Sequence, residues 1–267
     1  MEGRDSGILS IITCHPSSAE LPILRASVNG NLGGERIEIS VTVGASSIAR
    51  AYNQGAKKST GGVLLFTHSD VEICSSRKLI EEAMAIVSNP AIGFLGIAGG
   101  RVLREDAIWW SQRDQLSGLC LHREGPRYWP TAFGMYGQVV VLDGVFLMCS
   151  RDTYEAIAGF DESIQGWDFY DIDATLRAYL LGKANVTFPI LCLHHSLGNI
   201  SNKPGWHMNR KTFLQKWGPK LPVVLDNRVI RFPDQTEGEV KVSGPPEDIA
   251  EKGTGPAEQG GGEPKSV

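Results

Sequence analysis

The sequence, 267 residues long, has no long uninterrupted hydrophobic run. Its most apolar stretches, 139–142, 145–149 and 190–193, are short and lie next to an aspartate or to histidines. Because a membrane-spanning helix needs about 20 apolar residues, no transmembrane segment is expected. The opening residues, MEGRDSGILS, also lack the charged-then-apolar order of a secretory signal peptide. These absences predict a cytoplasmic protein, for which only peripheral contact with a membrane stays open.

Cysteine is scarce and its spacing is irregular. The five cysteines are an odd number and include no Cys-x-x-Cys pair, so the sequence indicates neither a disulfide framework nor a structural zinc site. Two of them, Cys149 and Cys192, stand inside apolar runs and are expected to be plain thiols of the core.

Net charge is absent from most of the chain. The sequence has 30 acidic and 26 basic side chains, of which seven acids and three bases fall in residues 235–267. Residues 1–234 therefore carry no net charge, which argues against a nucleic-acid-binding protein because phosphate neutralisation needs a basic surface. The final segment has seven glycines, four prolines and no aromatic residue. This composition predicts a disordered acidic tail at 235–267, after a single domain at 1–234.

The first half of the chain alternates strand-like and helix-like segments. Strands are expected at 7–13, 36–43, 63–66 and 92–97, and helices at 20–28, from Ser46 or Ser47 to Gly61-Gly62, and at 76–87. This alternation predicts an α/β fold with a mixed, mostly parallel sheet and helices on both faces. Ligands of such sheets bind at the carboxyl ends of the strands, which here are 13–15, 43–47 and 67–70.

The second half is less regular. Residues 101–136 contain three of the six tryptophans and are expected to form a long functional loop or a small additional sheet. Further strands are expected at 138–142, 145–149 and 185–193, and helices at 152–158 and 171–181, the second of which Gly182 closes. The last strand would place His194 and His195 at its end.

His68 and Asp70 are the first candidates for a chemical role. They follow a buried strand as residues i and i+2, so both side chains can face one ligand. An imidazole and a carboxylate suit Mn²⁺ or Mg²⁺, and such a cation would hold a diphosphate. The alternative is a turn that Asp70 caps. His194 and His195 would face opposite ways at a strand end, so at most one of them is expected to reach the same ion.

Acidic residues beside aromatic ones form the second group of candidates. Asp168, Asp171 and Asp173 precede or open a helix, where carboxylates complement the helix dipole. Capping accounts for one of them, and a second could act as a general base beside the carbohydrate-stacking surface of Trp167 and Tyr170. We expect Arg177 to pair with Asp173, four residues before it. Asp143 stands alone between apolar strands, so it is either hydrogen-bonded or in contact with a ligand, which Gly144 would let approach closely.

In their order, these motifs resemble the family 2-like glycosyltransferases of the GT-A fold, in the bacterial branch where a His-x-Asp motif replaces Asp-x-Asp. The matching segments are ILSIIT, SSIARAYNQGAKKSTGGVLLFTHSDV, GIAGG, VVVLDGVFLMCSRDTYEAIAGFDESIQGWDFYDIDATLRAYLLGKANV and LHHSLG, which cover most of residues 7–200. The chain departs from the family pattern where ISVTVGAS lacks the acid of the nucleobase pocket, and where Tyr170 replaces a glutamate.

The resemblance implies a role for each candidate. It places the divalent cation on Asp70, with His68 and with His194 or His195, and the catalytic base on Asp171. It implies contacts to the donor sugar or the acceptor for Asp143, Gly144, Trp167, Asp168 and Tyr170, with the Trp109-Trp110 loop completing the acceptor wall. The nucleotide-binding residues that it implies are Thr13, His15, Ser47, Arg50 and Asn53.

The function expected from this resemblance is sugar transfer from a UDP- or GDP-linked donor to an acceptor hydroxyl, with inversion and with a divalent cation. The acceptor would be a carbohydrate or a lipid-linked molecule, in surface polysaccharide or glycan assembly. One alternative is a catalytically inactive sugar-nucleotide-binding module, which the missing nucleobase acid favours. A sugar-phosphate nucleotidyltransferase is the other, but its glycine-rich phosphate loop after the first strand is absent, since CHPSS stands there.

Overall fold

The computed structural model describes residues 5–33, 35–196 and 204–226. The tail expected at 235–267 lies outside these ranges. Among the described residues, no helix is long and apolar enough to cross a membrane.

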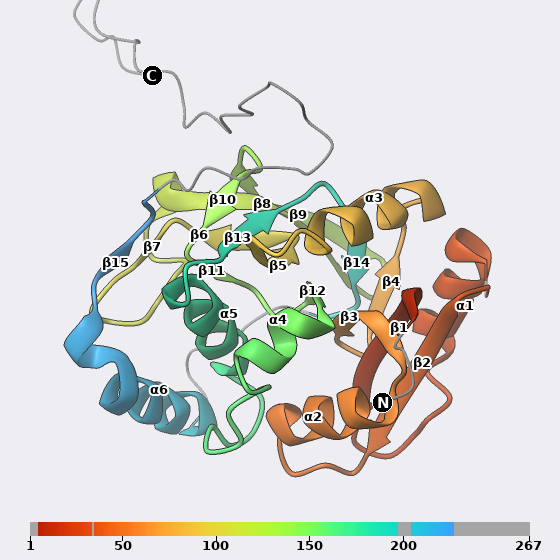
Figure 1. Cartoon of the computed structure of the whole chain (residues 1–267), viewed down its shortest axis with the longest axis horizontal. Coiled ribbons are helices and arrows are strands. Elements are labelled where there is room, and N and C mark those ends of the chain that lie inside the picture. Colours follow the sequence, from red (N-terminus) through yellow and green to blue (C-terminus); the bar gives the residue numbers. More distant parts are fainter. Residues whose placement is uncertain (1–4, 34, 197–203, 227–267) are drawn as a thin grey trace, which may run out of the picture.

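A seven-stranded sheet forms the centre of the molecule (Figure 1). Five of its strands run in one direction and two, β12 and β10, run in the other. In spatial order the strands are β10 (Gln138–Val139), β13 (Ala184–Thr187), β5 (Ile92–Gly96), β12 (Phe146–Ser150), β3 (Gly61–Thr67), β1 (Asp5–His15) and β2 (Ile37–Val43). The sheet is thus mixed and mostly parallel, as the sequence predicts, although β12 separates β3 from β5.

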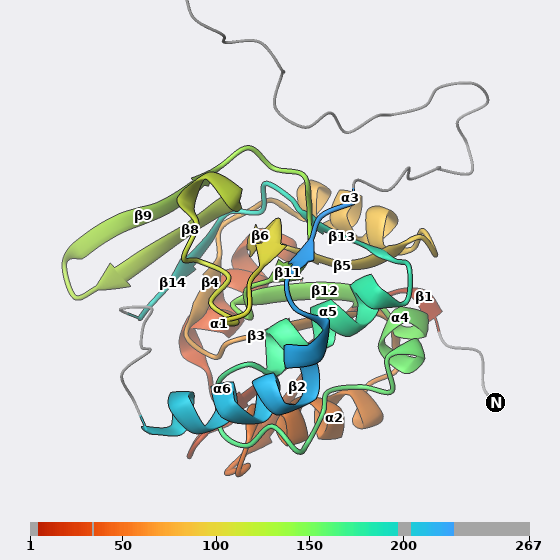
Figure 2. The same cartoon turned by 90° about the vertical axis from the view of Figure 1, so that its left-hand side faces the viewer.

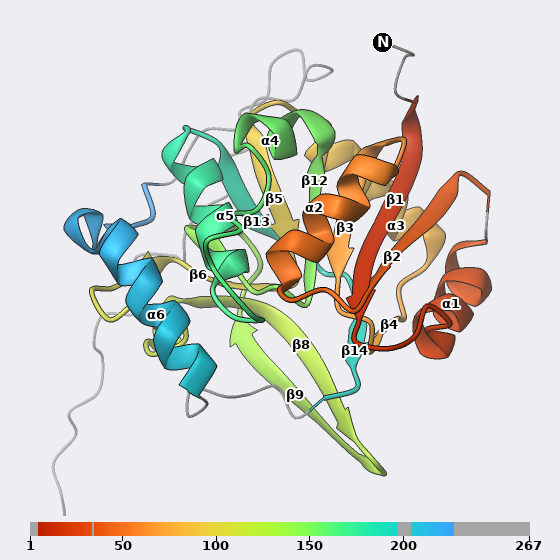
Figure 3. The same ribbon diagram turned by 90° about the horizontal axis from the view of Figure 1, so that it is seen from below.

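Helices cover both faces of this sheet, because successive strand residues point to opposite sides. Along β3, Leu64 and Phe66 pack in the cluster that includes α2 and α4, whereas Val63 and Leu65 pack in the cluster that includes α1 and α3. Figure 3 shows the two pairs of helices on opposite sides of β1 and β3. The helices are α1 (Pro22–Ser27), which continues as the π-helical η1 (Val28–Leu32), α2 (Ile48–Lys58), α3 (Arg77–Val87), α4 (Arg151–Ala156), α5 (Tyr170–Leu180) and α6 (Pro204–Trp217).

A second sheet crosses one end of the first. Its strands are β11 (Val141–Leu142), β6 (Ala98–Gly100), β8 (Leu116–Glu124), β14 (Cys192–His194) and β4 (Val71–Ile73), with β9 (Arg127–Gly134) paired to β8. Strands β8 and β9 form a hairpin that projects from the body of the molecule (Figure 2). Of the two possibilities for residues 101–136, the structure therefore shows a small sheet. Short pieces complete the fold: β7 (Val102–Leu103) pairs with β15 (Val223–Val224), and η2 (Arg113–Gln115) and η3 (Gly218–Lys220) are 3₁₀ turns.

Three expectations about the elements were wrong. Gly61 and Gly62 do not end α2, which stops at Lys58; they begin β3, where Gly61 lies too close to Ile8 for a side chain. The strand expected at 185–193 is two strands, β13 and β14, in different sheets, because the chain turns at 188–191. The strand expected at 138–142 is also two strands, β10 and β11, in different sheets. In addition, helix α6 lies where no helix was expected, since its apolar residues do not form a regular stripe along the sequence.

Candidate metal and active site

Three potential metal ligands meet where β3 and β14 end. His68 and Asp70 follow β3, and His194 is the last residue of β14. The His194 Nε2 lies 3.4 Å from Asp70 Oδ1 and 3.4 Å from His68 Nδ1. One ligand atom from each residue lies within 4.8 Å of the other two. We call His68, Asp70 and His194 the Asp70 cluster.

Hydrogen bonds set the tautomer of His68. Its Nε2 lies 2.9 Å from the hydroxyl of Tyr170, and this hydroxyl donates to the backbone carbonyl of Gly144 at 3.3 Å. A carbonyl oxygen only accepts, so the hydroxyl proton points to Gly144 and the Tyr170 oxygen accepts from His68 Nε2–H. The lone pair of a neutral His68 is therefore on Nδ1, which faces Asp70 and His194. This arrangement suits a divalent cation with imidazole and carboxylate ligands.

His195 points away from this cluster, as alternation along a strand requires. Its Nε2 lies 3.0 Å from Glu72 Oε2, while its backbone N–H donates to the carbonyl of Asp70. Glu72 and His195 line an open groove of about 1010 Å³ between η1 and the tip of the β8–β9 hairpin. Of the two adjacent histidines, the structure brings only His194 to Asp70.

The Asp143-Gly144 turn lies beside the Asp70 cluster because β12 pairs antiparallel with β3. Phe146, at the start of β12, is opposite Thr67, at the end of β3. Asp143 folds back on its own turn, where Oδ1 accepts from the N–H of Val145 at 3.0 Å. A Cβ on Gly144 would be 2.0 Å from the Tyr170 hydroxyl and 3.1 Å from Asp171 Oδ2. Glycine is therefore required here for the close approach of α5.

The carboxyl group of Asp171 is the most perturbed acid of the site. Burial, followed by the negative charge of Asp143, raises the pKa of Asp171 to about 7. A hydrogen bond from the backbone N–H of Gly144 acts in the opposite direction. A carboxylate with this pKa exchanges protons near neutral pH, which is the property that a general base needs.

Asp173, two residues further along α5, holds other parts of the protein together. Its side chain is fully buried. Oδ1 accepts from Lys216 Nζ at 2.7 Å and from Trp217 Nε1 at 2.8 Å, and Oδ2 pairs with Arg177 at 2.8 Å. The expected intrahelical pair with Arg177 is confirmed, and the same carboxylate fastens α6 to α5. It is therefore Asp171, rather than Asp173, that faces Asp143 and Gly144.

The expected nucleotide-binding residues divide into two groups. His15 shares a small pocket of about 180 Å³ with Asp70 and Ser69. Thr13, two residues before it in β1, is buried, and its hydroxyl has no hydrogen-bond partner among the described residues. Ser47 caps α2 by accepting from the backbone N–H of Arg50 at 3.3 Å.

Arg50 and Asn53 hold the loop after α4. The Arg50 guanidinium pairs with Glu162 at 3.3 Å. The Asn53 amide donates to the carbonyl of Phe160 and to Glu162, and its oxygen accepts from the hydroxyl of Tyr154 and from the N–H of Phe160. All the hydrogen-bonding groups of the Asn53 side chain thus have protein partners.

The aromatic residues expected at the acceptor wall differ in exposure. Trp167 is 49% exposed and Trp110 is 39% exposed, whereas Trp109 is buried. Asp168, next to Trp167, accepts a hydrogen bond from Asn209 at its backbone carbonyl. Only Trp167 and Trp110 therefore offer a broad ring surface to a ligand.

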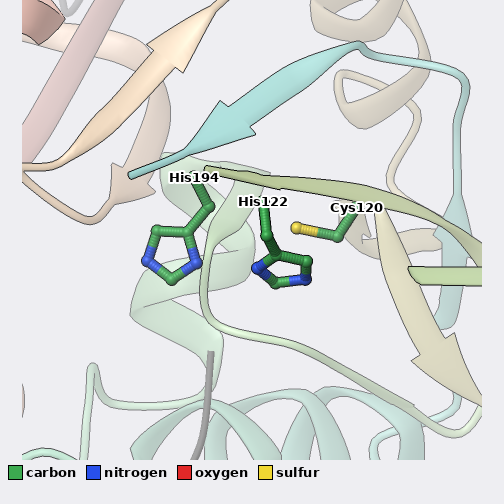
Figure 4. A group of neighbouring side chains, drawn as sticks. All are labelled: Cys120, His122 and His194. Atoms are coloured by element: carbon green, nitrogen blue, oxygen red, sulfur yellow. The ribbon is translucent and has the colours of Figure 1, made fainter. Parts of the chain in front are cut away.

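Sequence reasoning missed two residues next to this site. Cys120 and His122 lie on β8 with their side chains turned toward His194 (Figure 4). Their signal was a Cys-x-His alternation within a strand, which places both side chains on one face.

The central sheet, with the small sheet across its end, has the GT-A fold. This structure is similar to that of GalNAc-T7, solved with UDP, GalNAc and Mn²⁺, with a TM-score of 0.56 and 12% sequence identity, over 79% of this chain and 48% of that one. The chain thus spans about half the length of GalNAc-T7. Identity at this level shows a shared fold.

Two further structures have lower scores. One is the mannosyltransferase PcManGT from Pyrobaculum calidifontis in complex with GDP-Man and Mn²⁺, with a TM-score of 0.48 and 14% sequence identity over 82% of this chain and 66% of that one. The other is TarS of S. aureus, with a TM-score of 0.49 and 13% sequence identity over 71% of this chain and 37% of that one. No curated protein matches the sequence. A family profile does: it covers residues 32–217, and the chain belongs to the glycosyltransferase-like family that it describes.

Proposed function

We propose that this protein transfers a sugar from a nucleotide-diphosphate donor to an acceptor hydroxyl, with inversion and with a divalent cation. One observation carries the proposal. The hydrogen bonds from His68 to Tyr170 and from Tyr170 to Gly144 join the Asp70 cluster to Asp171 and the Asp143-Gly144 turn. A candidate cation site and a candidate base thus belong to one constellation at the end of a GT-A sheet.

Two residues of the Asp70 cluster, Asp70 and His68, fit a divalent cation. Asp70 offers a carboxylate oxygen, and the hydrogen bonds of His68 leave its Nδ1 lone pair facing the same space. Bound there, Mn²⁺ or Mg²⁺ would supply positive charge to the diphosphate that leaves. GalNAc-T7 and PcManGT were both solved with Mn²⁺, which supports the choice of ion to test first.

Asp171 acts as the base in this proposal. Its carboxylate accepts the proton of the acceptor hydroxyl as the acceptor oxygen bonds to the anomeric carbon. The bond from this carbon to the diphosphate oxygen breaks in the same displacement, and the configuration inverts. Burial and the charge of Asp143 raise the pKa of Asp171, so the carboxylate is a stronger base than an ordinary aspartate. Trp167 and Tyr170, with Asp168, flank the space for the sugar or the acceptor.

We assign the nucleotide to the region of Thr13, His15 and Ser47. The pocket shared by His15 and Asp70 and the unpartnered hydroxyl of Thr13 support this assignment. Arg50 and Asn53 act on the nucleotide indirectly, through the loop at 160–162 that they hold. A cytoplasmic location, a carbohydrate or lipid-linked acceptor and a role in polysaccharide assembly stay predictions.

A donor screen that measures released nucleotide diphosphate tests the proposal. UDP- and GDP-sugars are supplied with Mn²⁺, Mg²⁺ or a chelator, and calorimetry with UDP and GDP measures binding in parallel. We expect turnover that a chelator stops. Asp171→Asn should reduce turnover at least 100-fold and leave nucleotide affinity unchanged, whereas Asp152→Asn, at an exposed position on α4, should change neither. Nucleotide binding without any turnover would refute the enzyme and favour the inactive binding module.

A further inference from the structure

A second group of possible metal ligands lies on the other side of His194. Cys120 Sγ and one ring nitrogen each of His122 and His194 lie within 4.8 Å of one another (Figure 4). Cys120 and His122 are residues i and i+2 of β8, so they share a face. His194 on β14 is directly opposite His122 in the parallel register of the two strands. The backbone pairing itself thus brings a thiol and two imidazoles together.

These side chains are buried, and two of their nitrogen atoms have no partner. Cys120 is 5% exposed, His194 6% and His122 9%. The Nδ1 atoms of both His122 and His194 are inaccessible to solvent and make no hydrogen bond to the described residues. Leaving buried polar atoms without a hydrogen-bond partner is unfavourable, so a group that engages both atoms would relieve that cost.

The hydrogen bonds around both histidines leave these two nitrogens with lone pairs. The backbone of Ser196 accepts a hydrogen bond from the His122 ring. Since Nδ1 of His122 has no partner, its Nε2 makes this bond and carries the proton. Nε2 of His194 faces two acceptors, Asp70 Oδ1 and the Nδ1 of His68, so it carries the proton of that ring. A neutral imidazole has one proton, which leaves a lone pair on each Nδ1.

Figure 4 shows a ring nitrogen of His122 and one of His194 directed toward each other, with the Cys120 sulfur beside them. Two lone pairs that face each other in a buried space repel unless a cation lies between them. We propose that Cys120 Sγ, His122 Nδ1 and His194 Nδ1 bind a zinc-type divalent ion. One thiolate and two imidazoles suit Zn²⁺, whereas Mg²⁺ and Mn²⁺ prefer oxygen ligands.

The separations are compatible with such an ion. Zn–S bonds are about 2.3 Å and Zn–N bonds about 2.0–2.1 Å. Ligand atoms within 4.8 Å of one another can close on one ion of this kind through small inward shifts of their side chains. Trp129 stacks on the His122 ring, with centroids 5.6 Å apart and planes 16° apart, and covers one side of the site.

This site is distinct from the Asp70 cluster and does not rest on the proposed sugar transfer. The two nitrogens of the His194 ring point to different groups: Nε2 to Asp70 and His68, and Nδ1 to Cys120 and His122. An ion on Nδ1 would fasten β14 to β8 and fix the His194 ring with Nε2 directed at Asp70. The site would thus position a member of the Asp70 cluster.

Cobalt substitution in the full chain tests the proposal. Protein freed of metal by a chelator is titrated with Co²⁺, because a cobalt–thiolate bond gives a charge-transfer absorption in the near ultraviolet. We expect this absorption to saturate at one ion per chain and to vanish when Zn²⁺ is added. Cys120→Ser should abolish it, and His122→Gln should weaken Zn²⁺ binding at least tenfold. Cys192→Ser, at a buried thiol of β14 outside the group, and Asp70→Asn should both retain it.

The result that overturns the site is a wild-type protein without the charge-transfer absorption, or an absorption that Cys120→Ser leaves intact. Loss of the absorption in Asp70→Asn would also overturn it, because the site would then depend on the Asp70 cluster instead of being distinct from it. X-ray absorption at the zinc edge of the wild-type protein does not depend on the folding of any variant. One sulfur and two imidazole nitrogens are expected there, and a shell of oxygen and nitrogen only would contradict the proposal.

Discussion

Replacing Asp171 by asparagine should make the protein more stable at pH 8 while it removes the proposed base. The folded-state pKa of Asp171 is about 7, against 3.8 for an ordinary aspartate. The folded protein therefore binds more protons than the unfolded chain between about pH 4 and pH 7. The contribution of Asp171 to stability falls as the pH rises through this range, and it is least favourable above pH 7. Asparagine keeps the shape and the acceptor oxygen but carries no charge.

The size of the effect follows from the shift. Three pKa units correspond to at most about 4 kcal/mol at about 1.4 kcal/mol per unit. The Asp171 side chain is only partly buried by its solvent exposure, so solvent screening reduces this limit, and we expect about 1–2 kcal/mol at pH 8. For a domain of this size, this corresponds to a rise in Tm of roughly 2–8 °C.

Urea unfolding of the wild type and Asp171→Asn at pH 5, 6.5 and 8 measures the difference. The stability gain should grow with pH, and Asp143→Asn should produce part of it, because the charge of Asp143 helps to raise the pKa of Asp171. A gain that does not change with pH, or a loss at pH 8, would show that the charge of Asp171 is compensated in the folded state. The argument for an elevated pKa, and with it for Asp171 as the base, would then fail.

Three further predictions concern the residues around this carboxylate. Gly144→Ala should displace Tyr170, whose hydroxyl would be 2.0 Å from the new Cβ. Because this hydroxyl orients His68, calorimetry should show that the affinity for Mn²⁺ is reduced at least tenfold. Gly205→Ala, where the new Cβ would lie in open space, should leave this affinity unchanged. Asp173→Asn should lower the free energy of unfolding by about 3 kcal/mol in urea, because it leaves Lys216 and Arg177 without their buried anion. Asn53→Ala should lower it by about 1–3 kcal/mol, and a fall in nucleotide affinity that exceeds this loss would assign Asn53 a direct contact.

The sequence predicts most elements of the central sheet because their signals are local. Ile12, Leu64 and Phe66 belong to short apolar runs that read as buried strands, and all are fully buried. Ser47 marks the start of α2, where it caps the helix as expected. The position of β12 between β3 and β5 has no local signal, since strand order depends on packing between segments about 50–90 residues apart in the chain.

The candidate site could be predicted as a set of residues but not as a geometry. His68 and Asp70 share a face by their spacing, so their proximity follows from the sequence alone. The choice between His194 and His195 does not, because it depends on which face of β14 is turned toward β3. The chain bends at 188–191 to place β14 in the second sheet, and this bend sets the face. Tyr170, expected at the sugar or acceptor, also orients His68 through its hydroxyl.

His194 shows why the second metal group was invisible in the sequence. Cys120 and His122 are more than 70 residues away from it in the chain, and they meet it only because β14 pairs in parallel with β8. A ligand set with Cys-x-His on one strand and a lone histidine on another has no recognisable spacing, unlike sites whose ligands follow a fixed interval. Both Nδ1 atoms are acceptors only because the Nε2 atoms carry the protons, and this depends on other segments: Ser196 is the partner of His122, and Asp70 is the partner of His194. If zinc binds Cys120, His122 and His194, the ligands on β8 fix the orientation of the His194 ring toward Asp70. The projecting β8–β9 hairpin then takes part in building the Asp70 cluster.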